Sequence, residues 1–586
     1  MDPHEQELSL DDAIGQCFMV GFYGTEPPQS LIELIARDRV GGVILFSRNC
    51  RGGPAQVRAL TARLQAAARA AGHPRPLLIA IDQENGLVRR LGPRATQFPG
   101  NMALGAAGDP ELTAAVAQAS GEELHALGIN LNLAPVADVN NNPANPVIGA
   151  RSFGEDPAVV GRHVAAAVRG YTAGGVIATL KHFPGHGDTA TDSHLGLPMV
   201  PHDRARLEAV ELLPFQAGLA EGAECVLTAH VALPRLTGGR AVPATLAPEI
   251  VRGLLREELG FDGVAITDCL EMDAVARGVG VAPGAIAALL AGNDIVLISH
   301  RRERQRAGLA AVRNAVEKGI LSAETVQAAA ARVLRLKRGL SWEDAGGDRT
   351  TEETEGTEDG EGEERPTAED AEGRGEGETA DVVSSKSPMA RVGAYGVRPQ
   401  RGKAMAAVGS PEHRELAARA YARGITLIRD DVPLLPLRLA AGQRIVVVAW
   451  RGPVSKAVDA RYTPEVFVAA IHAHNGDVSS TVLSAAPTRD ELQALQAKAA
   501  SAEIMLLLTL NAHRDPAQAE VMRALAAKAR QVVMVAVADP YDAATLSNVP
   551  TVLATYDYST PALEAAAHAL FAADPPPGRL PVSLGA

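Results

Sequence analysis

One pattern recurs eight times between residues 17 and 299: a short apolar run, a polar or glycine-containing turn, and a stretch with helical periodicity. The apolar runs are Phe18–Phe22, Gly42–Phe46, Leu77–Ile81, Ile129–Leu133, Val176–Leu180, Cys225–Ala229, Val264–Thr267 and Asp294–Ser299. The helical patterns include 55–71, 110–127, 158–173, 204–221, 247–258, 303–318 and 323–337. Eight strand-helix units in roughly 250–350 residues are typical of a closed (β/α)8 barrel of the TIM type. We therefore predict such a barrel for the N-terminal part of this α/β chain.

Ionisable side chains follow most of these runs. In a parallel barrel the carboxyl ends of the strands meet on one face, and that face carries the site. The residues at those ends are Asp82, Asp138, Lys181, His182, His230, Asp268 and His300. Any one of them alone fits a strand-end cap or a solvated turn. Their convergence on one face favours an active site.

The fifth run leads into the loop Lys181–His194, which carries three histidines and two aspartates. A proline and two glycines in its first half exclude a continuing strand or helix. Titratable groups gathered on a loop beside a buried strand are typical of a catalytic loop. A metal site at His182, His186 and Asp188 is disfavoured, because a loop rich in glycine fixes no ligand geometry. We expect no metal and no other cofactor.

An acidic, low-complexity tract separates the barrel from the rest of the chain. Between Ser341 and Lys386 there are 17 acidic and 4 basic residues, so this tract carries 4 − 17 = −13, which equals the net charge of the whole chain, 56 − 69 = −13. The remainder is therefore close to neutral and has no basic footprint for nucleic acid. Such a tract buries too little apolar surface to fold, so we predict a disordered linker. A tail that binds a basic partner is the alternative.

The second half of the chain contains further apolar runs separated by helical patterns. The runs are Arg444–Trp450, Ile504–Leu510, Val532–Ala538 and Val552–Tyr556, and the helical patterns are 464–474, 489–500, 517–530 and 561–571. This alternation predicts an α/β sandwich with a mostly parallel sheet. No GxGxxG or P-loop sequence marks it as a nucleotide domain. The predicted domains are the barrel at 1–340, the linker at 341–393 and the sandwich at 394–586.

The composition and the N-terminal residues predict in which compartment the protein occurs. Apolar residues make up 46% of the chain, and no run of eighteen uncharged apolar residues occurs, so we expect no membrane span. The N-terminal residues lack the basic and apolar regions of a secretory signal. Four cysteines make a poor disulfide framework for a chain of 586 residues. We expect a cytoplasmic protein.

Several motifs together identify a family. They are Asp82-Gln-Glu, Arg151-Ser-Phe-Gly-Glu-Asp-Pro, Lys181-His-Phe-Pro-Gly-His-Gly-Asp-Thr with Asp192-Ser-His194, and Ile266-Thr-Asp268. The barrel half closely resembles glycoside hydrolase family 3, and more narrowly its bacterial β-N-acetylglucosaminidase branch in the two-domain form. The second half, with its closing Pro576-Pro-Gly-Arg-Leu-Pro-Val-Ser-Leu, is similar to the family's C-terminal sandwich domain.

The resemblance assigns roles to the matching positions. It implies that Asp268 is the nucleophile and that His194 is the general acid/base with Asp192 as its partner. It implies that the non-reducing sugar is held by Asp82, Arg90, Arg151, Lys181 and His182. The chain departs from many relatives at Asn85, Leu87 and Cys269, and these departures bear on fine substrate preference.

The resemblance implies retaining hydrolysis of terminal β-N-acetylglucosamine residues, with muropeptides of the recycled cell wall as substrate. The expected ligand is a carbohydrate that contains N-acetylglucosamine.

 A donor imidazole suits the two steps, because a reference pKa of about 6.5 lets it be protonated in the first and neutral in the second. The alternatives are a family member with β-glucosidase or β-xylosidase specificity, an N-acetylglucosaminide phosphorylase, and a sugar-binding protein without turnover. Protein partners stay open.

Overall fold

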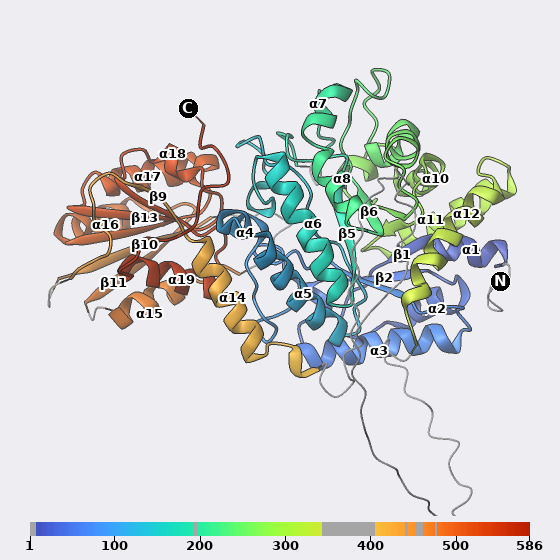
Figure 1. Ribbon diagram of the computed structural model, residues 1–586, viewed down its shortest axis with the longest axis horizontal. Helices are drawn as coiled ribbons and strands as arrows, with labels where there is room; N and C mark the ends of the chain where they lie inside the picture. Colours follow the sequence, from blue (N-terminus) through green and yellow to red (C-terminus); the bar gives the residue numbers. More distant parts are fainter. Residues whose placement is uncertain are drawn as a thin grey trace, which may run out of the picture.

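The structure of the protein, a computed structural model, describes residues 8–192, 196–342, 405–439, 443–452, 461–474 and 477–585. Two sheets organise these residues: one of eight strands in the first half of the chain and one of six strands in the second half. Figure 1 shows the two halves side by side, with helix α14 between them. The predicted linker at 341–393 lies outside the described residues, except for its first two positions, so it stays a prediction.

Each of the eight predicted runs in the first half corresponds to a strand. The strands are β1 (Phe18–Val20), β2 (Gly42–Leu45), β3 (Leu78–Ile81), β4 (Leu131–Asn132), β5 (Ile177–Phe183), β6 (Cys225–Thr228), β7 (Val264–Thr267) and β8 (Val296–Ile298). They pair in parallel in the order β7-β6-β5-β4-β3-β2-β1-β8. A parallel bridge between Ile266 and Ile295 links the two ends of this sheet. The predicted barrel is thus confirmed.

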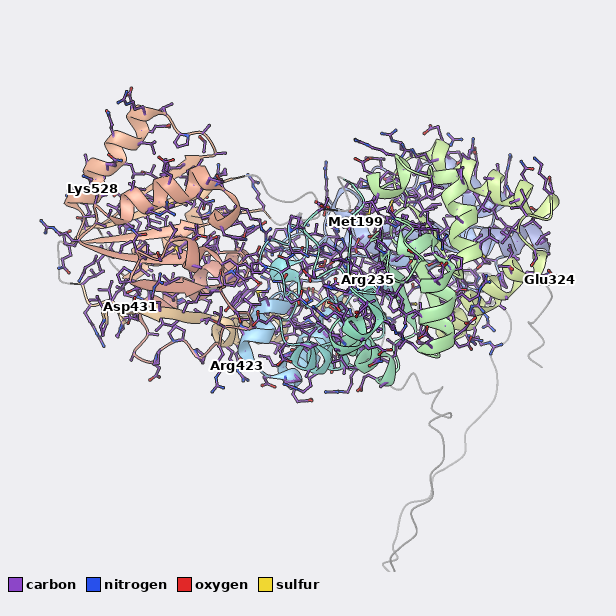
Figure 2. All side chains as sticks on the ribbon, turned by 90° about the horizontal axis from the view of Figure 1, so that it is seen from above. Met199, Arg235, Glu324, Arg423, Asp431 and Lys528 are labelled. Carbon is purple, nitrogen blue, oxygen red and sulfur yellow. The ribbon has the colours of Figure 1, made fainter. Side chains whose placement is uncertain are left out.

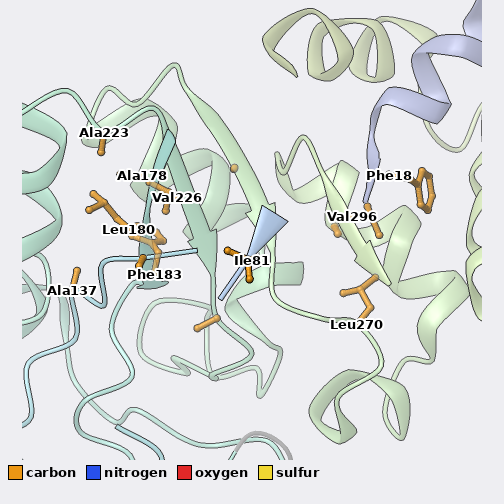
Figure 3. Packing of buried hydrophobic residues seen from close by; sticks show 14 of the residues in the cluster. Phe18, Ile81, Ala137, Ala178, Leu180, Phe183, Ala223, Val226, Leu270 and Val296 are labelled. Carbon is orange, nitrogen blue, oxygen red and sulfur yellow. The ribbon is translucent and has the colours of Figure 1, made fainter. Parts of the chain in front are cut away.

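Successive side chains of the barrel strands point alternately inward and outward, as a β-strand requires. The inward set forms one apolar cluster that includes Met19, Ile44, Ala80 and Leu227. The outward set packs against the surrounding helices in a larger cluster, and Figure 3 shows some of its members. Because both faces are covered, the strands read as continuous apolar runs in the sequence.

Helices cover the outside of the barrel. They are α1 (Leu10–Gln16), α2 (Gln29–Arg37), α3 (Pro54–Ala70), α4 (Asn101–Ala107), α5 (Pro110–Ala126), α6 (Pro157–Ala173), α7 (Arg204–Ala209), α8 (Leu213–Ala220), the π-helix η4 (Glu249–Glu258), α9 (Asp273–Ala276), α10 (Val281–Ala291), α11 (Arg302–Glu317) and α12 (Ala323–Leu336). The prediction of one helix over 204–221 is wrong, because the chain breaks into α7 and α8. Pro214 explains the break, since proline is tolerated in the first turn of α8 but not inside a helix.

The second sheet is mostly parallel, as predicted. Its strands are β9 (Thr426–Asp430), β10 (Ile445–Arg451), β11 (Val478–Ser484), β12 (Ile504–Thr509), β13 (Gln531–Ala536) and β14 (Thr551–Ala554), in the order β11-β10-β12-β13-β14-β9. Only β9 runs antiparallel to its neighbour. The helices are α14 (Pro411–Gly424), α15 (Glu465–His474), α16 (Arg489–Ser501), α17 (Pro516–Ala526), α18 (Asp542–Thr545) and α19 (Thr560–Phe571). Apolar clusters on both faces of the sheet confirm the sandwich.

The four cysteines are all buried, and none forms a disulfide bond with another. Among the described helices, none has the length and apolar character needed to cross a membrane.

Helix α14 joins the two halves. It packs against α4 and α5 of the barrel and against α19 of the sandwich. Arg423 of this helix pairs with Asp109 at 2.7 Å, and Figure 2 shows Arg423 where the two halves meet. At the other end of α14, His413 contacts Glu123 through Nδ1 at 3.1 Å and Glu122 through Nε2 at 3.2 Å. Both glutamates belong to α5, so ion pairs as well as apolar contacts tie the second half to the barrel.

A buried carboxylate stands at the seam between β7 and β8. Asp294 is fully buried, accepts a hydrogen bond from the Ala265 backbone N–H at 2.8 Å, and pairs with Arg256 and Arg332. The two arginines come from η4 and α12, so one side chain connects two strands and two outer helices. Breaking a buried pair leaves an uncompensated charge, which costs more than the loss of a surface pair.

We expect Asp294→Asn to lower the free energy of unfolding by roughly 3 kcal/mol, because Arg256 and Arg332 would lose their buried counter-charge. Urea denaturation followed by circular dichroism measures this change. Asp262→Asn is the matched control: it removes the exposed partner of Arg335 and should cost less than about 0.5 kcal/mol. Equal losses in both variants would contradict the role of Asp294 at the seam.

His413 should make stability depend on pH. Burial lowers the pKa of His413, but the hydrogen bonds and charges of Glu122 and Glu123 outweigh burial and raise it to about 9 from an ordinary 6.5. A raised pKa in the folded state stabilises the fold below the unfolded pKa, and this contribution is lost as pH rises through the folded pKa. The difference in thermal midpoint between the wild type and His413→Gln should therefore be largest near pH 6 and shrink above pH 9. A difference that stays constant across this window would refute the assignment.

Candidate active site

The carboxyl ends of the barrel strands bring most of the predicted site residues together. Asp82 directly follows β3, and Asp268 directly follows β7. Lys181 and His182 lie inside β5, which continues to Phe183 and is therefore longer than the predicted strand. Residues after β4 continue beside β5, since Ala137 donates its N–H to the carbonyl of Lys181. This pairing carries the next residue of that segment, Asp138, to the same place.

Asp82 lies between two cations. Its Oδ1 is 2.8 Å from the Nζ of Lys181, and its Oδ2 is 3.6 Å from a guanidinium nitrogen of Arg90. The same Lys181 ammonium lies 2.6 Å from Oε1 of Glu84. Side-chain exposure is 17% for Asp82, 9% for Arg90 and 2% for Lys181, so Asp82 is the most accessible of the three and Lys181 the least.

Glu84 continues this chain of charges to Arg151. The guanidinium of Arg151 binds Glu84 with two hydrogen bonds, Nε to Oε2 at 2.8 Å and Nη2 to Oε1 at 2.7 Å. Such paired bonds fix both the position and the plane of the guanidinium. Its Nη1 also donates to the carbonyl of Val147 at 3.1 Å. Arg151 is therefore held on several sides before any ligand binds.

Two contacts orient the ring of His182. Its Nε2 lies 3.3 Å from Nη2 of Arg151. Its Nδ1 lies 2.7 Å from Oδ2 of Asp138. Asp138 and Arg151 thus hold the imidazole between them.

The carboxylates of the network are held ionised. Burial raises the pKa of Glu84, but the charges of Arg151 and Lys181 outweigh burial and place this pKa well below its usual range. Burial also raises the pKa of Asp138, and the charge and hydrogen bond of His182 outweigh it, so this pKa too lies below its ordinary value. Neither carboxyl group is suited to donate a proton near neutral pH.

Asp268 begins the loop after β7. Its backbone N–H donates to the carbonyl of Thr228 on β6 at 3.0 Å, and its Oδ1 accepts the N–H of Cys269 at 2.7 Å. The carbonyl of Cys269 contacts Nε2 of His230 at 3.0 Å, and the other ring nitrogen of His230 contacts Thr245. The buried His230 thus supports the backbone at Cys269, the residue after Asp268.

The remaining catalytic candidates lie on the loop after β5. Asp192 is partly buried, and its carbonyl accepts the N–H of Gly196 at 3.2 Å. His194 lies outside the described residues. The His194 and Asp192 pair therefore stays a prediction from the sequence.

The described part of this loop is built by internal hydrogen bonds. His186 is buried, its Nδ1 lies 2.8 Å from the hydroxyl of Thr189, and burial lowers its pKa to about 4. Asp188 pairs with His202 at 2.7 Å. Among the described residues, no group of three or more His, Cys, Asp or Glu side chains is arranged to hold a metal ion.

The structure adds residues that the sequence did not single out. Glu84 is the junction of Arg151 and Lys181, and its signal was its place in the Asp82-Gln-Glu motif. Gln83 accepts the backbone N–H groups of Arg90 and Leu91 through Oε1, and so sets the turn that carries Arg90.

Glu271 lies just past Asp268, and its side chain is only 4% exposed. It accepts the backbone N–H groups of His300 and Arg301, which lead into α11. Glu271 thus connects the segment after β7 to the segment after β8.

Some known proteins match the first half of the chain, and others match both halves together. Residues 9–336 match the model described as the glycosyl hydrolase family 3 N terminal domain. Over 337 residues the chain is 42% identical to Beta-hexosaminidase A of Pseudoalteromonas piscicida, an alignment that covers 54% of this chain and 56% of that protein. The chain thus spans little more than half of that relative's length. A Beta-hexosaminidase of Stenotrophomonas maltophilia (strain R551-3) is 40% identical over 288 residues, which cover 48% of this chain and 83% of that protein.

A solved structure matches both halves at once. The glycoside hydrolase family 3 beta-N-acetylglucosaminidase from Paenibacillus sp. str. FPU-7 superposes with a TM-score of 0.83 at 38% identity, covering 98% of this chain and 99% of that one. The family model covers more than half of the present chain, and this relative shares its fold across both sheets. The protein therefore belongs to glycosyl hydrolase family 3.

Proposed function

We propose that the protein is a retaining β-N-acetylhexosaminidase that removes terminal, non-reducing β-N-acetylglucosamine residues. The observation that carries the proposal is the row of alternating charges Arg90, Asp82, Lys181, Glu84 and Arg151 at the carboxyl ends of the strands. Three cations and the carboxylates of Asp82, Glu84 and Asp138 balance one another there. Fixed donors and acceptors with little net charge suit the hydroxyl groups of a neutral sugar. The names of the hexosaminidase relatives support the same activity.

In this proposal Asp82, Arg90 and Arg151 contact the non-reducing sugar, because they are the more exposed members of the row. His182, which lies beside Arg151, contacts the sugar as well. Lys181 aligns Asp82 and Glu84 with two of its three N–H donors and offers the third to a sugar hydroxyl.

The reaction then proceeds in two displacements. A carboxylate oxygen of Asp268 bonds to the anomeric carbon while the bond to the leaving oxygen breaks, and His194 gives its proton to that oxygen. His194, now neutral, takes a proton from water, and the hydroxide oxygen displaces Asp268 and releases the sugar. Asp192 orients the imidazole. The low pKa values of Glu84 and Asp138 support a donor from the loop, since these buried carboxylates stay ionised.

Cell-wall muropeptides as substrate and a cytoplasmic location complete the proposal, and both rest on the motif resemblance. The general test is release of an aryl alcohol from an N-acetyl-β-glucosaminide and from the matching β-glucoside, with and without phosphate. Preference for the acetamido sugar without any effect of phosphate supports the proposal. Preference for the glucoside would move the specificity to a β-glucosidase, and a sugar phosphate product would replace hydrolysis by phosphorolysis.

Asp268→Asn should lower kcat to below roughly a thousandth of the wild-type value, because an amide cannot form the glycosyl intermediate. Initial rates with the aryl N-acetyl-β-glucosaminide measure the loss. Asp273→Asn, five residues further along the chain and paired with Arg277, should keep activity near that of the wild type. A variant at Asp268 that retains a tenth of the rate would exclude this residue as nucleophile.

His194→Ala should depend on the leaving group. Proton donation contributes typically about 100-fold or more where the leaving oxygen is basic, and much less for an activated aryl group. We expect a loss of at least about 100-fold with a disaccharide and a far smaller loss in the first step with a nitrophenyl glycoside. Pre-steady-state kinetics separate this first step from hydrolysis of the intermediate. Equal losses in the first step for both substrates would remove His194 from the donor role.

A further inference from the structure

We propose that the second sheet positions the two arginines that hold the sugar: Asp539 fixes the turn that ends in Arg151, and Asp557 fixes the loop that carries Arg90. This inference rests on the proposed function for the two arginines. It assigns a task to the C-terminal half, which contributes no member of the charged row at the strand ends.

Asp539 follows β13 and is nearly buried, with 3% of its surface exposed. Its own half of the chain fixes it: its N–H donates to Oδ1 of Asn511 at 3.1 Å, and its Oδ2 pairs with Arg514. Its Oδ1 crosses to the barrel and accepts the backbone N–H of Ala150 at 2.7 Å. A carboxylate that is already oriented loses little entropy when it holds a partner.

Ala150 is the middle residue of the one-turn 3₁₀-helix η2 (Gly149–Arg151). Gly149 has φ +47°, and a Cβ at this position would come 2.4 Å from Oδ1 of Asp539. A side chain here would therefore meet both backbone strain and the carboxylate. Glycine lets Asp539 approach the turn closely enough to hold it.

A second contact supports the same turn. The hydroxyl of Tyr541, two residues beyond Asp539, accepts a hydrogen bond from Nδ2 of Asn140 at 2.7 Å. Oδ1 of Asn140 in turn accepts the N–H of Gly149 at 3.1 Å. Two successive N–H groups of η2 thus depend on residues 539 and 541 of the second half.

The loop that carries Arg90 is tied down independently. Its neighbour Arg89 lies 3.6 Å from Asp557, which follows β14 and is fully buried. Leu87 packs against two apolar clusters that contain sandwich residues. The departure at Leu87 is therefore a contact between the two halves, although the sequence related it to substrate preference.

Small shifts of these loops have a direct consequence for binding. The paired hydrogen bonds between Arg151 and Glu84 need the guanidinium plane in place, and a displacement near 1 Å is enough to impair a positioned group. Arg151 and Arg90 contact the sugar in the ground state and in the transition state alike. Loosening their loops should therefore raise KM more than it lowers kcat.

The first test is Asp539→Ala in the full chain, with the aryl N-acetyl-β-glucosaminide as substrate. We expect KM and the inhibition constant of free N-acetylglucosamine to rise roughly tenfold, with kcat within about threefold of the wild type. Asp539→Asn keeps an acceptor for Ala150 and should restore most of the affinity. Tyr541→Phe removes one hydroxyl without changing the shape of the ring, and should raise KM roughly threefold even if Asp539→Ala folds poorly.

Two controls separate positioning from general destabilisation. Asp542→Asn removes a buried carboxylate of the same segment whose hydrogen bonds go to His513, and it should leave KM unchanged. Arg423→Ala breaks a different ion pair between the halves and should also leave KM unchanged. In an Arg151→Lys background, Asp539→Ala should change KM by less than about twofold, because the two side chains act through one interaction.

Hydrogen exchange of the peptide that contains residues 149–151 tests the same contact without any substrate. Exchange should be faster in Asp539→Ala than in the wild type and in Asp542→Asn. If the wild type turns over the substrate while KM and exchange are unchanged in Asp539→Ala and Tyr541→Phe, the inference is overturned and the proposed function stands. If exchange rises but the wild type cleaves no aryl glycoside, the proposed function fails and the positioning contact stands.

Discussion

Pairing of buried charges is the constraint on which the rest of the site depends. Removing an ion from water costs several kcal/mol unless an opposite charge and hydrogen bonds compensate it. Arg151 and Lys181 are almost fully buried, so Glu84 must lie between them, and Lys181 must reach Asp82 across 99 positions of sequence. The barrel supplies this arrangement because parallel strands end on one face. The charges in turn make one geometry much more stable than its alternatives.

Because these carboxylates are paired with cations, sugar binding and proton donation belong to different residues in the proposed site. Carboxylates that are locked to cations bind well and donate protons poorly, as the low pKa values of Glu84 and Asp138 illustrate. A proton donor for glycoside cleavage must therefore come from outside the row. The sequence places a further histidine, His194, after β5, and this residue stays the proposed donor.

Sequence and structure agree where local patterns decide the outcome. All eight barrel strands were predicted because each is a continuous apolar run between two helical patterns. Strands β9 and β11 were missed because they lie at the edges of the second sheet: Val478–Ser484 is rich in serine and threonine and only partly buried. The roles of Glu84 and Asp539 were also missed. Each depends on a partner 67 or 389 positions away, and no local pattern records such a contact.

Two buried carboxylates, Asp294 and Asp539, have similar roles, because each accepts a backbone N–H group of another segment of the chain. Asp294 links β7 to η4 and α12, beside the bridge between Ile266 and Ile295 that closes the eight-stranded sheet. Asp539 links the second half to η2, where a one-turn helix has too few internal hydrogen bonds to hold its own position. In both places a backbone N–H group, that of Ala265 or that of Ala150, donates to a buried carboxylate instead of to a backbone carbonyl. In the interpretation proposed above, the positions of the charged side chains at the strand ends depend on contacts made by residues outside the row.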